Sequence, residues 1–233
     1  MLRKFLFIIY CLTVISCSEK PEKDFKAFSD DFVKGYIQLF PDETPLSKEN
    51  ENLVLLALPT SDYLDSVRQF HQLFSTELKQ FDTHNPALPH AKDARKVGNI
   101  LNNVKGFLTD YAQNPVRFNV LHGFKRILEG KYAPDEYRSQ TIFDKLAHVP
   151  TFYEAAKSQV TTANRSFDDA AVEQQVQTFL FFDKTLPDFL SGRHLMTPQY
   201  TARILAAKLA IKDYVAYVES FREIGRASCR ERV

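Results

Sequence analysis

Histidine is the residue type in this sequence that is best suited to binding a metal ion or moving a proton. The chain has 6 histidines but no HExxH pattern, which would place two zinc ligands and a glutamate base on one helix. His71 falls on an apolar helical face, whereas His84 and His90 lie in or beside a proline-containing loop. His194, in a loop between two long predicted helices, has no second ligand or nucleophile nearby. We therefore predict no catalytic, cofactor-binding or metal-binding residue.

Carboxylate pairs and glycine-rich loops, which could support acid–base catalysis or phosphate binding, give no stronger signal. Asp30-Asp31 and Asp168-Asp169 lie where helices are expected to start, and aspartates there usually cap the helix or face its dipole. The glycines form neither GxGxxG nor a Walker loop, so no nucleotide site is predicted. The formal net charge of +1 gives no basic surface for a polyanion, and we expect no nucleic-acid partner.

One cysteine has a specific chemical context. Cys17 ends the sequence Val14-Ile15-Ser16-Cys17, which has the order of a bacterial lipobox: aliphatic residues, a small residue and then cysteine. In proteins with that motif the thiol receives a diacylglyceryl group, and two or more acyl chains hold a protein durably on a bilayer. We predict lipidation at Cys17, a membrane as partner, and a cell-envelope location facing the periplasm or the exterior. The alternative is a chance cysteine in an ordinary secretory signal.

The residues around Cys17 fit an exported precursor. Residues 1–16 are predicted to be a signal peptide, because a basic start precedes an apolar run that is too short to span a bilayer. Residues 17–24 are predicted to be the lipidated cysteine and a charged, flexible tether. The other two cysteines are Cys11, in the signal, and Cys229, near the C-terminus. The exported domain therefore needs an apolar core rather than a disulfide, and the 20 Phe and 10 Tyr suit that purpose.

The sequence of residues 223–233 matches the translation of a common sequencing-library adapter, and we interpret it as a non-native tail. A genuine basic tail is the alternative. On the adapter interpretation the native polypeptide continues beyond Arg222, and residues 25–222 are a truncated helical domain.

Between these ends, helical periodicity predicts an all-α domain, arranged as an irregular multi-helix array without repeats. The first helix is expected to begin near Asp24, and the second to be capped by Ser61 or Asp62. Other helices are expected at about residues 97–111, 116–128, 134–146, from 149, 168–185, and from a Thr197 cap onward, with a weaker segment at 53–58. The apolar stripes of the last two helices are expected to belong to the core. Their residues are Val172, Val176, Phe179 and Leu180 on the first, and Ile204, Leu205, Leu209, Ile211, Tyr214 and Val218 on the second. The run Phe179–Phe182 is predicted to be helical, with a buried strand as the alternative.

Several motifs, taken in order after the lipoprotein-like start, resemble a known family. They are Asp110-Tyr111-Ala112-Gln113-Asn114-Pro115, the stretch Phe143 to Pro150 with the following helix and Asn164, and the long alanine-bearing last helix. Over most of residues 25–222 they resemble the N-terminal part of bacterial proteins grouped as domain of unknown function 885.

The resemblance implies that the chain is the N-terminal part of a larger helical, zincin-like metallopeptidase fold. The HExxH helix of that fold lies in a C-terminal half, so the resemblance assigns no catalytic residue to this fragment. It implies zinc and a peptide or small-molecule substrate for the intact protein, which would be a membrane-anchored, zinc-dependent hydrolase. The alternative hypothesis is a non-catalytic helical lipoprotein that acts as an envelope binding or scaffold module.

Overall fold

The computed structural model describes residues 24–41, 58–81, 85, 87–161 and 165–230, and only the backbone of residues 165, 166 and 222–230. Cys17, the weaker segment at 53–57 and Asn164 lie outside the described residues. Within the described ranges every regular element is a helix, which confirms the predicted all-α, irregular multi-helix array for that part of the chain.

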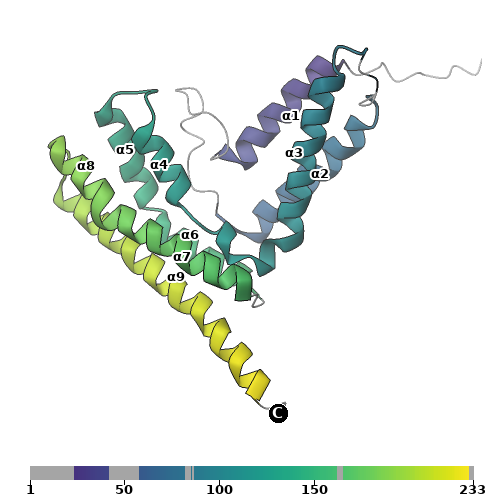
Figure 1. Ribbon diagram of the computed structural model, residues 1–233. Coiled ribbons are helices and arrows are strands. Elements are labelled where there is room, and N and C mark those ends of the chain that lie inside the picture. Colours follow the sequence, from purple (N-terminus) through teal and green to yellow (C-terminus); the bar gives the residue numbers. More distant parts are fainter. Residues whose placement is uncertain (1–23, 42–57, 82–84, 86, 162–164, 231–233) are drawn as a thin grey trace, which may run out of the picture.

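The first three helices form one arm of a V-shaped molecule (Figure 1). They are α1 (Phe25–Leu39), α2 (Ser61–Leu78) and α3 (Ala91–Asp110). Phenylalanines at helical spacing on α1 meet those of α2, and Phe32 packs edge to face on Phe74 with ring centroids 5.3 Å apart. At Gly35 a Cβ atom would lie 3.0 Å from the Phe70 ring, so the absent side chain lets the two helices approach closely.

Short polar side chains determine where these and later helices begin. Asp24 accepts the Lys26 N–H at 3.1 Å, as predicted for the start of α1. The predicted cap of α2 is wrong by one or two residues, because the Thr60 hydroxyl, rather than Ser61 or Asp62, accepts the Tyr63 N–H at 3.2 Å. Each such cap stabilises a helix by about 1 kcal/mol.

The chain bends between α3 and α4 through two 3-10 turns, Tyr111–Gln113 and Pro115–Arg117. The side chain of Asn114 holds the bend, because it accepts the Val116 N–H at 3.2 Å and donates to Asp110 at 2.9 Å. The predicted helix at 116–128 is therefore wrong at its start. Asn119 bonds to the Leu121 N–H at 2.8 Å, and α4 runs from Leu121 to Glu129.

The second arm contains α4, α5 (Asp135–Leu146), α6 (Val149–Gln159), α7 (Arg165–Leu180), α8 (Leu186–Gly192) and α9 (Pro198–Arg230) (Figure 1). The long helix α9 packs along both α6 and α7. It begins as predicted, with the Thr197 hydroxyl accepting the Tyr200 N–H at 3.2 Å. Its backbone stays helical through the predicted boundary at Arg222.

Between α7 and α8 the helix widens into a π-helical turn, Phe181–Thr185. Pro187 has no N–H to donate, and the Leu186 N–H reaches back five residues to the Phe181 carbonyl. The prediction of a helix over 168–185 is confirmed as helical structure, including the run Phe179–Phe182, whereas the sequence pattern does not predict the π-turn. In the described part of the chain no helix has both the length and the apolar composition to cross a membrane.

Candidate functional site: the outer surface of α7 and α9 and the polar network beneath it

A buried polar network fixes α6 and α7 to the bend between the arms. The Tyr153 hydroxyl on α6 donates to the Gln175 side-chain oxygen on α7 at 2.7 Å, and the Gln175 amide donates to the Phe118 carbonyl at 2.7 Å. The Asn119 amide donates to the Thr178 hydroxyl, also at 2.7 Å. Because a buried polar group is costly unless it is paired, these bonds specify how the bend and the two helices fit together.

Burial keeps the tyrosines of this region protonated. It raises the pKa of the Tyr153 and Tyr214 phenols well above the ordinary value for tyrosine. The Tyr214 hydroxyl donates to the Pro115 carbonyl at 3.1 Å, and the Tyr153 and Tyr214 rings have centroids 5.1 Å apart. Both phenols therefore act as hydrogen-bond donors, an arrangement suited to positioning helices rather than to acid–base catalysis.

A second polar cluster joins α4, α5 and the end of α8. The Arg138 guanidinium donates to the carbonyl oxygens of Ile127 and Leu128 in the last turn of α4 and pairs with Asp135. Asp135 also pairs with Arg193. Hydrogen bonds from Arg193 and then Arg138 lower the pKa of the Asp135 carboxyl, against the opposing effect of desolvation. The carboxylate stays ionised, so this cluster is an ion-pair network rather than a source of protons.

The outer surface of α7 and α9 carries aliphatic side chains that the sequence pattern assigns to the core. Val176 and Leu180 on α7 are 48% and 49% exposed, and Leu205 and Leu209 on α9 are 54% and 58% exposed. We call these four residues the α7–α9 apolar face. Each pair is four residues apart, which places its two side chains on the same face of a helix. The prediction that the apolar stripes face the core is wrong for these four residues, whereas Ile204, Ile211, Tyr214 and Val218 of the α9 stripe are buried as expected.

The inner side of α7 shows why that prediction fails. Its buried positions include Asp168, Gln175 and Thr178, none more than 1% exposed. These polar side chains share the inner side of α7 with Ala171, and partners from other elements bond to Gln175 and Thr178. Val176 and Leu180 lie on the outer side. Sequence periodicity finds the apolar stripe of a helix but assumes that it faces inward. The partners that make the polar side favourable come from residues 57 to 59 positions away at Phe118 and Asn119.

The histidines that the structure describes are not brought together. His71 is partly buried on α2, with its Nε2 3.4 Å from the Ser75 hydroxyl. His90 stacks on Phe25 with ring centroids 5.2 Å apart. His84 lies outside the described residues. In the described ranges no group of three or more His, Cys, Asp or Glu side chains is arranged to hold a metal ion.

His194 has a backbone role at the end of α8. Its φ of 58° lies in the left-handed region, where the chain closes the helix. The Leu195 N–H bonds to the Leu190 carbonyl at 2.8 Å, and the His194 N–H bonds to the Ser191 carbonyl at 3.1 Å. These two bonds define a Schellman motif, in which glycine is the usual residue at the left-handed position. The His194 side chain is exposed.

The two aspartate pairs differ in where they lie relative to the start of their helices. Asp30 and Asp31 lie inside α1 rather than at its start, and Asp30 pairs with Lys26 at 2.7 Å on the exposed surface. The prediction that they cap a helix is wrong, because the earlier Asp24 takes that position. Asp168 does lie in the first turn of α7, where a carboxylate is favourable to the helix dipole.

Comparisons with known proteins show the fold. No protein-family model matches this chain, and no curated protein matches it in sequence. Among solved structures, the chain is similar in fold to a proposed lipoprotein of unknown function from Shewanella oneidensis, with a TM-score of 0.73 and 21% sequence identity. The match covers 87% of this chain and 38% of that chain, so this chain spans well under half the length of the protein that it resembles.

Proposed function

We propose that this chain is the N-terminal helical domain of an exported lipoprotein, held on a membrane through Cys17, and that it acts as a scaffold or binding module in the cell envelope. The observation that carries the proposal is the lipobox-like sequence that ends at Cys17, shortly before α1 begins at Phe25. The similarity in fold to a proposed lipoprotein supports it. A helical domain with an aromatic core, in which buried polar side chains hydrogen-bond to other groups of the domain, is suited to a structural role.

Replacing Cys17 with serine is expected to prevent acylation, because serine has no thiol to receive the diacylglyceryl group. In cells fed a clickable fatty acid, the wild-type protein should carry the label and sediment with membranes. The Cys17→Ser protein should lose the label and appear mainly in a soluble fraction. Cys11→Ser, inside the predicted signal peptide, is the matched control and should behave like the wild type. Equal labelling and equal sedimentation of Cys17→Ser and wild type would show that no lipid is attached at this residue.

A second candidate function concerns the intact protein. The resemblance to domain of unknown function 885 implies a zinc-dependent, peptidase-like hydrolase whose catalytic helix follows the present domain. One observation favours a longer protein, whatever its activity: the similar solved structure has most of its length outside the matched part. In this candidate α1 to α9 form helical walls and supply no chemistry. A native gene that continues beyond Arg222 without a histidine–glutamate zinc motif would contradict it.

A further inference from the structure

Helix α7 carries exposed aliphatic side chains on the side away from its own core, next to the exposed carboxylates of Asp169 and Glu173 nearer its start. Its inner side is buried through Asp168, Gln175 and Thr178, and its outer side carries Val176 and Leu180. Exposed aliphatic side chains one turn apart on two neighbouring helices are typical of a surface that another element covers. We infer that the α7–α9 apolar face is the docking surface for a helical segment that follows α9 in the intact protein and packs aliphatic side chains against it.

The two aliphatic pairs lie on helices that pack against each other; we call the pairs and the contact between them the strip. The ring of Phe179 lies between the two helices, and the ammonium groups of Lys208 and Lys212 on α9 lie 5.2 and 5.1 Å from its centroid. The methylene stems of these lysines therefore run across the contact between α7 and α9. Isolated exposed aliphatic residues are normal on a protein surface, whereas a continuous apolar patch marks an interaction site.

The length of the similar solved structure indicates what covers the strip. The match covers 38% of that chain, so a protein with this fold can carry most of its length outside α1 to α9. Further helices of the same polypeptide are present at high effective concentration, and they need only an apolar stripe to pack on the face. The inference rests on the proposed function, in that it takes the chain to be the N-terminal domain of a longer lipoprotein.

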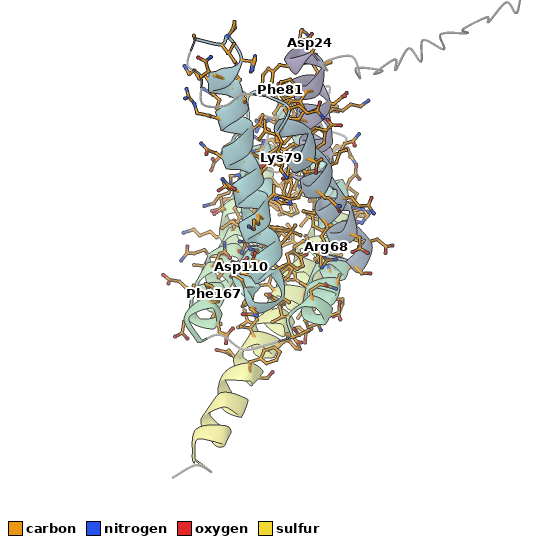
Figure 2. All side chains as sticks on the ribbon, turned by 90° about the vertical axis from the view of Figure 1, so that its right-hand side faces the viewer. Asp24, Arg68, Lys79, Phe81, Asp110 and Phe167 are labelled. Carbon is orange, nitrogen blue, oxygen red and sulfur yellow. The ribbon has the colours of Figure 1, made fainter. Side chains whose placement is uncertain are left out.

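A membrane surface fits the strip less well. Residues 18–24, between the predicted anchor and the first helix, can span at most about 25 Å even when fully extended. Figure 2 shows Asp24 near Phe81 at one end of the α1–α3 arm, with Asp110 toward the other end. Helix α3 alone is about 30 Å long, which is more than residues 18–24 can span. The α7–α9 apolar face lies on the other arm (Figure 1). In addition, Lys208 is already paired with Asp183 instead of being free to meet lipid phosphates.

Thiol accessibility tests the docking surface. Leu205→Cys and Leu209→Cys are each made in two proteins that lack all other cysteines: the 233-residue chain, and the longer product of the native gene. Leu73→Cys on α2, which replaces a residue that is 52% exposed and distant from the face, is the matched control. The rate of reaction with a soluble maleimide is measured for each. At Leu205→Cys and Leu209→Cys the rate is expected to be about tenfold or more lower in the longer protein, because a covered thiol reacts only when the covering segment opens locally. The control rate is expected to stay the same.

Each of the other outcomes overturns the inference. Equal rates in the two proteins would show that the continuation leaves the face uncovered, and a native gene that stops near Arg222 would remove the proposed occupant. Protection in the 233-residue chain that rises with concentration, together with a doubled mass, would assign the face to a second copy. Protection that appears only with phospholipid vesicles would assign it to a membrane. The acylation of Cys17 is measured separately, so a failure here leaves the lipid anchor to be judged on its own test.

Discussion

Phe182→Ala is expected to destabilise the domain by about 3–5 kcal/mol, the range found when a large buried aromatic side chain is removed. Phe182 is fully buried in the π-helical turn, where its ring packs edge to face on Phe124 with centroids 5.0 Å apart. The truncation leaves a cavity between α4 and the α7–α8 connection that the surrounding helices can fill only in part. Urea unfolding followed by circular dichroism measures the loss as a lower midpoint at an unchanged slope.

Leu180→Ala is the matched control for this substitution. Leu180 lies two residues earlier but is 49% exposed on the α7–α9 apolar face. Its truncation in the 233-residue chain is expected to cost less than about 1 kcal/mol, because most surface substitutions have small effects. A loss at Leu180 equal to that at Phe182 would contradict the assignment of the inner and outer sides of this helix.

Arg138→Met is expected to destabilise the domain by about 2–4 kcal/mol, even though methionine has a similar length. The substitution removes the donors that satisfy the Ile127 and Leu128 carbonyls at the end of α4. Buried acceptors that lose a charged donor incur a desolvation penalty as well as the lost bond. Asp135 would keep Arg193 as its partner, which limits the loss. The measurement is again the midpoint of urea unfolding.

Arg68→Met provides the comparison for Arg138. Arg68 pairs with Asp65 on the surface of α2, where both side chains are mostly exposed. Exposed pairs of this kind contribute about 0–1 kcal/mol, so the expected change is small. Similar losses at both positions would indicate that Arg138 acts through general charge rather than through the carbonyl groups of α4.

Sequence reasoning predicts the helices well where one side of the helix carries regularly spaced large apolar residues. Phe28 and Phe32 on α1 face the aromatic core, and Asp24 begins the helix as its type predicts. The pattern fails where a local hydrogen bond decides the backbone. Asn114 and Asn119 each bond to an N–H two residues ahead, and these bonds replace the first turns of the predicted helix at 116–128.

The candidate site could be predicted only in part, for a physical reason. The predicted lipidation of Cys17 rests on a short local motif that can be recognised in the sequence, although that residue lies outside the described structure. The α7–α9 apolar face cannot be recognised from the sequence. Gln175 and Thr178 can face the core only because they bond to Phe118 and Asn119, which are distant in the sequence. From the sequence alone Val176 and Leu180 are therefore expected in the core, whereas the structure buries the side of α7 that carries Gln175 and Thr178.

The intact mass of the mature protein purified from membranes is the most direct test of a lipid at Cys17. We predict an N-terminus at Cys17 that carries a diacylglyceryl group, with the mass of at least two acyl chains above that of the polypeptide. A mature chain that begins at another residue, or an unmodified Cys17 in the membrane fraction, would contradict the proposed anchor.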